Sequence, residues 1–476
     1  MTKSLPIFLS ILFLGVQLSF AQNLVDAEYK GSISKEDMIA NYGFLMQYGV
    51  DMYKITYETN DVFGQLDTAS GLLVLPMHDQ PTEFPLLCYQ HGTINSPTDV
   101  PSNLQGGYEL ATIFAAVGYV TTAADFLGMG ESRGFHPYVH ADSEASAAID
   151  MLFAARQYAD QNDILLNDQL FVTGYSQGGH AAAAAHRTLQ ENYSDEFTVT
   201  ASAPMSGPYS ISGEMRDVIL SNEEYFFPAY APNTILSYDY VYDLFDEVVE
   251  VFKEPYATVI SQFYDNQIGL GTLNNLLITQ LTANSGASVA RNLFQDSIIM
   301  EVENNFDHPF NVALRDNDVY DWTPQAPTRL IYCQADDQVV YTNAIVADSV
   351  MNMNGAPDVM ALNVNPTANH GQCVEPATIS ALLFFAGFQD ITVDINQLES
   401  PSIDIYPNPA RTSITIASTK TNSRYRLIDT QGRSIETGRL QDEQTTLDIS
   451  QFANGLYFLQ IEHDQKIFQE KIIIQK

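Results

Sequence analysis

Cysteine and basic side chains are both scarce in this sequence. Only three of its 476 residues are cysteine, so a framework of disulfides cannot hold the fold together. Lys and Arg total 21 against 58 Asp and Glu, which gives a formal net charge of −37. The last 76 residues hold nine charges of each sign, so the acidic excess lies in the first 400. Such a surface repels phosphate backbones, so we expect no nucleic-acid partner and interpret the acidity as a source of solubility.

Motifs for metal binding are also missing. The chain has no His-Glu-x-x-His sequence, no cysteine–histidine cluster and no acidic run with the spacing of a calcium-binding loop. His136 and His140 stand four residues apart, but Pro137 between them disfavours a helix that would present both. We therefore expect no metal ion and no cofactor.

No apolar run reaches the length of about 18 residues that a membrane-spanning helix needs. The N-terminal apolar stretch, residues 7–16, follows Lys3 and precedes the small-residue sequence Ser19-Phe20-Ala21. This order is typical of a cleaved signal peptide. We predict a signal peptide over residues 1–21 and an exported mature protein without a transmembrane segment.

After residue 22, short apolar runs alternate with helical segments. The patterns predict strands at 53–59, 69–75, 85–89, 119–124, 169–173 and 328–333, and helices at 109–117 and 143–160. Some of the runs are apolar throughout, as expected for strands buried on both faces of a sheet. This alternation favours the α/β class, with a mostly parallel, doubly wound sheet in a domain at residues 22–392.

The alternation stops between residues 208 and 320. Apolar residues there have the 3- and 4-residue spacing of an amphipathic helix, at Val241, Leu244, Phe245, Val248, Val249 and Phe252. We predict a helix over 241–252 and further helical stretches to about residue 305. An insertion of this size between core strands indicates a helical cap over the active site. The alternative is a helical subdomain that only thickens the fold.

The composition changes again near residue 390. Residues 393–402 are polar and include a Ser-Pro step, so we predict a linker there. From 403 to 476 there is no helical periodicity, and short alternating runs occur at 413–417, 425–428 and 456–461. These runs predict a small antiparallel β-sandwich.

The sequence Gly174-Tyr175-Ser176-Gln177-Gly178 lies between a predicted strand and an alanine-rich helical run. This context is that of a nucleophile elbow, in which a sharp turn projects the serine hydroxyl from the top of a sheet. A free serine hydroxyl is a poor nucleophile, so it needs an adjacent base, usually a histidine held by a carboxylate. We predict Ser176 as the nucleophile.

The base should lie downstream, after the acid. Of the later histidines, His180 and His186 are too close to the elbow, His308 ends the predicted cap and His463 belongs to the tail. His370 remains, in a loop-like segment. The acid is expected just after the strand that ends at Cys333, where both Asp336 and Asp337 could serve. We favour Asp336, because a valine that re-enters the core follows it closely.

The oxyanion that forms on the substrate needs backbone N–H donors. We predict one from Gln177, directly after the nucleophile, and one from Thr93, in the loop after the strand 85–89, where Gly92 permits close backbone approach. Cys333 and Cys373 flank the loops that carry the acid and the base. They could form a disulfide in an oxidising compartment or remain free thiols.

Several stretches resemble the α/β-hydrolase superfamily, and within it the secretory lipases of the yeast lipase A type. They are Tyr57-Glu58-Thr59, residues 70–76, Tyr89-Gln90-His91-Gly92-Thr93, residues 124–130, Pro137-Tyr138 and residues 174–179. The similarity covers most of residues 50–390. It implies hydrolysis of a small-molecule or lipid ester through an acyl-enzyme on Ser176, with substrate choice set by the cap.

The tail resembles the type IX secretion sorting domain of certain Gram-negative bacteria. The resemblance rests on residues 405–410, 427–432, 447–450 and 455–458, which occur in the expected order. It implies recognition by the type IX secretion machinery and an extracellular or cell-surface enzyme. A peptidase of the same fold is the main alternative, because the triad alone does not distinguish esters from amides. A non-catalytic binding protein on a hydrolase scaffold is a weaker one.

Overall fold

The computed structural model describes residues 23–393, 403–418, 423–429, 433–442, 444–463 and 466–476. The chain divides into two compact units, with the boundary between Thr392 and Val393. The predicted signal peptide, residues 1–21, lies outside the described residues. So does the predicted linker 393–402, apart from its first residue.

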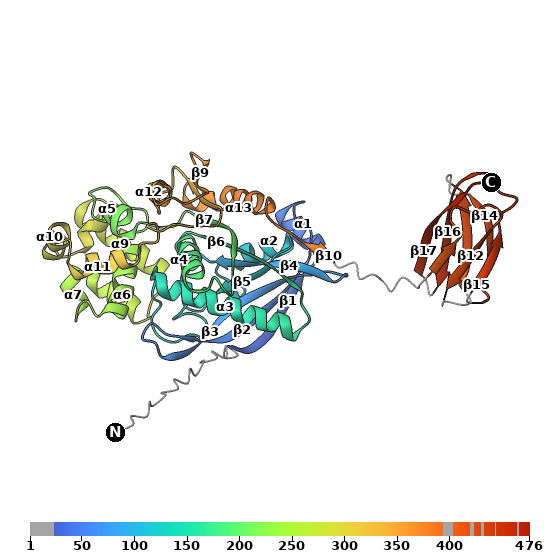
Figure 1. Cartoon of the computed structure of the whole chain (residues 1–476). Helices are drawn as coiled ribbons and strands as arrows, with labels where there is room; N and C mark the ends of the chain where they lie inside the picture. The colour runs from blue at the N-terminus through green and yellow to red at the C-terminus, as the bar shows by residue number, and fades with distance from the viewer. Residues whose placement is uncertain (1–22, 394–402, 419–422, 430–432, 443, 464–465) are drawn as a thin grey trace, which may run out of the picture. The chain divides into compact units, whose positions relative to one another are not determined.

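The first unit is built on a mixed sheet (Figure 1). Its strands are β1 (Leu24–Ile33), β2 (Val50–Asn60), β3 (Leu66–Pro76), β4 (Thr82–Gln90), β5 (Val120–Ala124), β6 (Leu166–Tyr175), β7 (Val199–Met205), β8 (Thr328–Cys333) and β9 (Val359–Asn365), and β10 (Thr392–Val393) follows. The order across the sheet is β1-β2-β3-β5-β4-β6-β7-β8-β9. The pairs from β5 through β4 to β9 are parallel, whereas β1, β2, β3 and β5 pair antiparallel.

Helices cover both faces of this sheet, because the alternating side chains of its strands are apolar on both sides. The helices of the core are α1 (Lys35–Tyr42), η1 (Pro101–Asn103), α2 (Tyr108–Ala116), α3 (Ala141–Gln161), α4 (Gln177–Asn192), α12 (Thr342–Met353) and α13 (His370–Ala386). Leu87 packs in the cluster formed with α1, α2 and α13. Its neighbours Leu86 and Cys88 pack in the cluster formed with α3 and α4. The predicted doubly wound α/β sheet is confirmed.

The segment between β7 and β8 is a helical insertion with an apolar core of its own. Its elements are η2 (Ile211–Met215), α5 (Arg216–Ile219), α6 (Tyr230–Tyr242), α7 (Val248–Val251), α8 (Tyr256–Tyr264), α9 (Leu270–Ser285), η3 (Ala290–Leu293), α10 (Asp296–Asn304) and α11 (Pro309–Asp316). Figure 1 shows them gathered beyond one end of the sheet. None of the helices in the described part of the chain is long and apolar enough to cross a membrane.

The single amphipathic helix predicted over 241–252 is wrong. Helix α6 ends at Tyr242, and Asp243 adopts a left-handed conformation with φ 55°. The carboxylate of Asp239 accepts hydrogen bonds from the backbone N–H groups of Leu244 (2.9 Å) and Phe245 (3.0 Å). This side chain replaces the helical partners of those groups and ends the helix, so Leu244, Phe245 and Val248 reach the apolar core of the insertion from a loop and the short α7.

The second unit is all β, as predicted. Its strands are β11 (Ile403–Tyr406), β12 (Ser413–Ser418), β13 (Arg424–Asp429), β14 (Ser434–Arg439), β15 (Gln444–Asp448), β16 (Gly455–His463) and β17 (Lys466–Ile474). They form two antiparallel sheets, β11-β12-β15 and β14-β13-β16-β17. Both sheets contribute to one apolar core, which includes Ile414, Leu447, Leu459 and Ile472.

Candidate active site

The ends of the central parallel strands bring the predicted site residues to one edge of the sheet. Gln90 at the end of β4 pairs with Gly174 of β6, and Tyr175 at the end of β6 pairs with Met205 of β7. Met205 in turn pairs with Ile331 of β8. The loops after β4, β6 and β8 therefore open at the same edge, where sheets of this kind bind ligands.

Ser176 occupies the tight turn between β6 and α4. Its backbone lies at φ 61° and ψ −122°, a conformation that side-chain-bearing residues rarely adopt. A Cβ at Gly174 would collide with the carbonyl of Gly178, and a Cβ at Gly178 would collide with the carbonyl of Gln90. Both glycines are therefore needed for the turn, which leaves the Ser176 side chain at the sheet edge.

Ser176, His370 and Asp336 form a continuous chain of hydrogen bonds. His370 Nε2 lies 2.8 Å from Ser176 Oγ, and His370 Nδ1 lies 2.7 Å from Asp336 Oδ2. A carboxylate accepts, so Nδ1 carries the hydrogen and Nε2 offers its lone pair to the serine hydroxyl. Ser176 and His370 are each 6% exposed, so little water reaches the three groups.

The second carboxylate of the acid loop has a different contact. Asp337 Oδ1 accepts a hydrogen bond from the backbone N–H of His370 at 3.2 Å. Asp336 Oδ1, the oxygen not used by the ring, accepts from the backbone N–H groups of Gln338 (3.0 Å) and Val339 (2.9 Å). Asp336 is thus fixed by its own loop, and Asp337 positions the start of α13.

The two predicted oxyanion donors lie in segments that pack on each other. Gln177 is the first residue of α4, and Gly92, next to Thr93, approaches the elbow closely enough that a Cβ there would lie 3.1 Å from the carbonyl oxygen of Tyr175 and 3.6 Å from Ser176 Cβ. The backbone N–H groups of Gln177 and Thr93 have no hydrogen-bond partner among the described residues. Both groups are free to bind an incoming oxygen.

A disulfide joins Cys333 and Cys373, with an S–S distance of 2.07 Å and both residues fully buried. Cys333 ends β8, three residues before Asp336, and Cys373 lies in α13, three residues after His370. The bridge therefore ties the segment that carries the acid to the segment that carries the base. Cys88 is buried and unpaired, and burial raises its thiol pKa to about 12.

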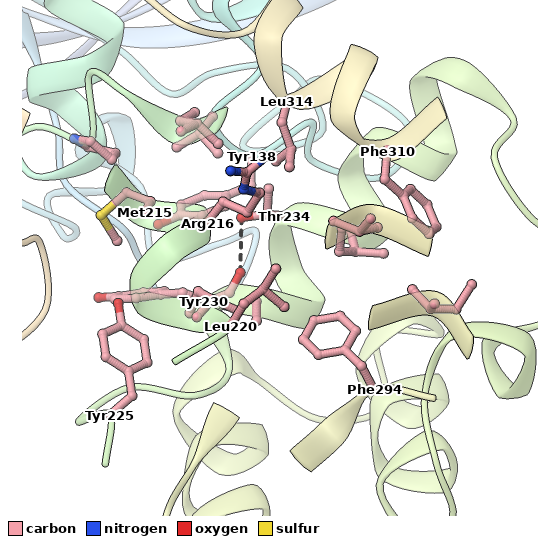
Figure 2. A pocket seen from close by; sticks show the side chains of 18 of the residues that line it. Tyr138, Met215, Arg216, Leu220, Tyr225, Tyr230, Thr234, Phe294, Phe310 and Leu314 are labelled. Atoms are coloured by element: carbon pink, nitrogen blue, oxygen red, sulfur yellow. Dashed lines mark hydrogen bonds between the residues drawn. The ribbon is translucent and has the colours of Figure 1, made fainter. Parts of the chain in front are cut away.

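An apolar pocket lies among the helices between β7 and β8 (Figure 2). Its walls include Tyr138 and Val339 from the core and residues from α5, α6, α10 and α11. Val339 belongs to the acid loop, and the Tyr138 hydroxyl lies 3.1 Å from Thr93 Oγ1. Tyr230 of α6 donates its hydroxyl hydrogen to Gln338 Oε1 at 2.7 Å. None of the predicted catalytic or oxyanion residues is among those that line the pocket, which neighbours the site through Val339 and Tyr138.

Several residues around the site were not predicted from the sequence. The Tyr175 hydroxyl donates to the backbone oxygen of His370 at 2.5 Å. Glu144 of α3 contacts Gln177 and His180 in the first turn of α4, and His136 also contacts the Gln177 side chain. These contacts join positions more than 30 residues apart, so a local sequence pattern cannot predict them. Among the described residues, no group of three His, Cys, Asp or Glu side chains is placed to hold a metal ion.

The first unit is similar to solved structures of esterases and a lipase. The rice cell wall degrading esterase LipA from Xanthomonas oryzae matches with 28% identity and a TM-score of 0.63, over 76% of this chain and 95% of that protein. A ligand-bound form of that esterase matches with a TM-score of 0.64. The closed state of Candida antarctica lipase A matches over 78% of this chain and 84% of that protein, with 16% identity and a TM-score of 0.57, which shows the shared fold. A search among curated proteins found no significant match.

Residues 404–475 match the model of the secretion system C-terminal sorting domain. This domain indicates type IX secretion and an extracellular or cell-surface location. Together with the esterase neighbours, it supports a secreted hydrolase of ester substrates. The chain therefore combines an α/β-hydrolase unit of the kind found in LipA-type esterases and Candida antarctica lipase A with a C-terminal sorting domain for type IX secretion.

Proposed function

We propose that the chain is a serine hydrolase that cleaves carboxylic esters through an acyl-enzyme on Ser176. His370 is the general base and Asp336 the acid that orients it, with Gln177 and Thr93 as the oxyanion donors. The observation that carries the proposal is the unbroken hydrogen-bond chain from Ser176 Oγ through the His370 ring to Asp336. Its order and geometry are those that nucleophilic acyl transfer requires.

Each step of the proposed reaction has a residue that could perform it. His370 Nε2 takes the hydroxyl hydrogen while Ser176 Oγ attacks the ester carbonyl carbon, and Asp336 stabilises the imidazolium that results. The negative charge on the carbonyl oxygen is bound by the free N–H groups of Gln177 and Thr93. His370 then protonates the departing alcohol. A water molecule, activated by the same ring, hydrolyses the acyl-enzyme and restores Ser176.

The pocket beside the site favours an ester with an apolar group. Of the residues that line it, Arg216 is the one with a charged side chain, and the others are mainly aliphatic and aromatic, such as Leu220, Phe294 and Phe310 (Figure 2). Burial of a hydrocarbon chain there would contribute about 0.8 kcal/mol per methylene to binding. We infer that this pocket receives the acyl chain or the alcohol, and that its length limits the preferred substrate.

The two ends of the chain carry the proposed export signals. We infer that residues 1–21 are a signal peptide that directs the chain to the secretory pathway before the C-terminal domain engages the type IX machinery. A chain that lacks residues 404–476 should then remain inside the cell envelope, whereas the full chain appears in the medium or at the cell surface. Equal export of both forms would contradict the assignment.

The test of the activity is hydrolysis of p-nitrophenyl esters from C2 to C16 by the purified protein. Ser176→Ala is the blank, and Ser285→Ala, on the exposed surface of α9, is the matched control. We expect activity in the wild type and in the control, and none in Ser176→Ala. Activity that survives in Ser176→Ala, or rates at the blank level for every ester, would overturn the proposal, and the second result would direct attention to peptide substrates.

A further inference from the structure

The buried carboxylate of Glu144 contacts two side chains in the first turn of α4, the helix that follows Ser176. Glu144, in the first turn of α3, is 1% exposed. Its Oε1 accepts a hydrogen bond from Gln177 Nε2 at 2.8 Å, and its Oε2 lies 2.7 Å from His180 Nδ1. The His180 side chain is fully buried. Gln177 is the residue whose backbone N–H is the proposed oxyanion donor, so Glu144 contacts the proposed oxyanion-binding segment directly.

The hydrogen bonds of His180 fix the charge of this pair. His180 Nε2 lies 2.8 Å from the backbone oxygen of Asn317, and a carbonyl only accepts, so Nε2 carries a hydrogen. The contact between Nδ1 and Glu144 needs one more hydrogen, whether it is on the ring or on the carboxyl group. In either form Glu144 and His180 together carry no net charge.

His136 is a second hydrogen-bond partner of the Gln177 side chain. Its Nδ1 lies 2.8 Å from the backbone oxygen of Leu127, so this nitrogen carries the ring hydrogen, and Nε2, 2.8 Å from Gln177 Nε2, accepts. Burial lowers the pKa of His136 to about 4, which keeps the ring neutral. The Gln177 amide therefore gives one hydrogen to Glu144 and the other to His136, while its Oε1 is buried without a hydrogen-bond partner among the described residues.

The neutrality of the pair matters because a negative charge develops on the substrate next to it. A carboxylate without a counter-charge, held within one side-chain length of the Gln177 backbone N–H in a buried site, would oppose formation of the oxyanion. With His180 present, the pair has no net charge to repel the oxyanion, and Glu144 still accepts its hydrogen bond from Gln177. The attachment of α3 to α4 does not itself need these groups, because closely packed alanines such as Ala148 and Ala181 already join the two helices.

We propose that Glu144, His180 and His136 are positioning residues that fix Gln177 as an oxyanion donor, and that the His180 ring keeps its pair with Glu144 free of net charge. This inference rests on the proposed function, since it assigns roles around the same serine. It predicts that replacement of the His180 ring weakens transition-state stabilisation more than substrate binding.

The decisive variant is His180→Asn, whose amide can still donate to Glu144 but brings no positive charge. We expect kcat/KM for a p-nitrophenyl ester to fall about 10- to 100-fold, somewhat less than the loss that follows removal of an oxyanion donor, with little change in KM. The inhibition constant of phenylboronic acid, which forms an anionic tetrahedral adduct with a serine, should rise by a similar factor. Adding Glu144→Gln to His180→Asn removes the uncompensated charge but keeps the acceptor, so most of the loss should be recovered.

His186→Asn is the matched control, because His186 is also a buried histidine of α4 but packs on Trp322, away from the elbow. It should leave kcat/KM unchanged. If His180→Asn does not fold, Gln177→Met serves instead, since it removes the side-chain amide and keeps the backbone N–H, and it should lower kcat/KM about tenfold or more. Circular dichroism establishes that each protein is folded.

Two results would overturn the inference. One is a folded His180→Asn protein with wild-type kcat/KM and a lower melting temperature, which would make the pair purely structural. The other is a double variant as slow as His180→Asn alone, which would refute the charge argument. Either can occur while the wild type hydrolyses esters and Ser176→Ala does not, so failure of the inference is distinct from failure of the proposed function.

Discussion

Asp336 and His370 meet across 34 residues of sequence, with the carboxylate 2.7 Å from the Nδ1 of the ring. The neighbouring carboxylate, Asp337, binds the backbone N–H of the same histidine at 3.2 Å. One acid therefore sets the tautomer and direction of the ring, and the other holds the main chain below it. Two adjacent residues of one type have different tasks because successive side chains leave the loop in different directions.

This division predicts unequal effects of two matched substitutions. Asp336→Asn should lower kcat by about 10³- to 10⁴-fold, because an amide in that place can donate to Nδ1 and favours the wrong tautomer. Asp337→Asn keeps an oxygen that accepts from the His370 backbone, so its effect should stay below about tenfold. Ester hydrolysis and melting temperature of both variants provide the measurement. A larger loss in Asp337→Asn would reassign the acid.

The glycines of the elbow lead to a second prediction. Gly178→Ala should abolish activity and lower the yield of folded protein, because the new Cβ would collide with the main chain at Gln90. Gly371→Ala is the control, since Gly371 directly follows His370 and its Cβ would lie 4.0 Å from the nearest side-chain atom, Asn369 Oδ1. That variant should stay active. Comparable activity in the two variants would show that the packing of the elbow tolerates a methyl group.

Local patterns were sufficient to predict the elements that carry the site. The strand before Ser176 and the helix after it are encoded by contiguous residues, and both are present, with β6 longer than the predicted strand at 169–173. His370 could be singled out by elimination because few histidines follow the elbow. The sequence favoured Asp336 over Asp337 only through the valine that follows, whereas the contact of Asp336 with the His370 ring depends on side-chain directions within one loop.

Patterns failed where a distant or competing partner decides the outcome. The spacing of residues 241–252 is truly amphipathic, but the Asp239 carboxylate ends the helix by binding two backbone N–H groups. The contact of Glu144 with His180 joins two helices, and in sequence each residue is an ordinary polar member of its helix. That pair is buried because α3 packs on α4. A short stretch of sequence contains only one of the two helices, so it cannot predict this packing.

Removal of the disulfide should affect stability and catalysis together. The bridge closes a loop of 40 residues, so the chain-entropy model gives about 4 kcal/mol of stabilisation. Because it anchors the segments of Asp336 and His370, we expect Cys333→Ala/Cys373→Ala to have both a lower melting temperature and a lower kcat. Cys88→Ala, a buried free cysteine, is the control for a change in packing alone. A double variant that melts earlier but keeps its kcat would show that the triad needs no covalent anchor.

The last prediction concerns His186, whose two ring nitrogens are buried without a hydrogen-bond partner in the described part of the chain. Burial lowers its pKa to about 3, against about 6.5 in an unfolded chain. Between these values the unfolded state binds more protons than the folded state, so stability falls as the pH falls. At pH 5 this group alone should cost about 2 kcal/mol relative to neutral pH.

His186→Phe should therefore be more stable than the wild type, by a margin that widens as the pH falls from 7 to 5. Phenylalanine can keep the edge-on contact with Trp322, at 4.9 Å between ring centroids in the wild type, and has no nitrogen to desolvate. Burial raises the pKa of Asp150 to about 6, so this group makes the fold more stable as the pH falls. Both proteins contain Asp150, so its effect cancels in the difference between their stabilities. Melting temperatures at pH 5, 6 and 7 test this, with His78→Gln on the surface as the control. A margin that does not change with pH would mean that His186 is not held neutral by burial.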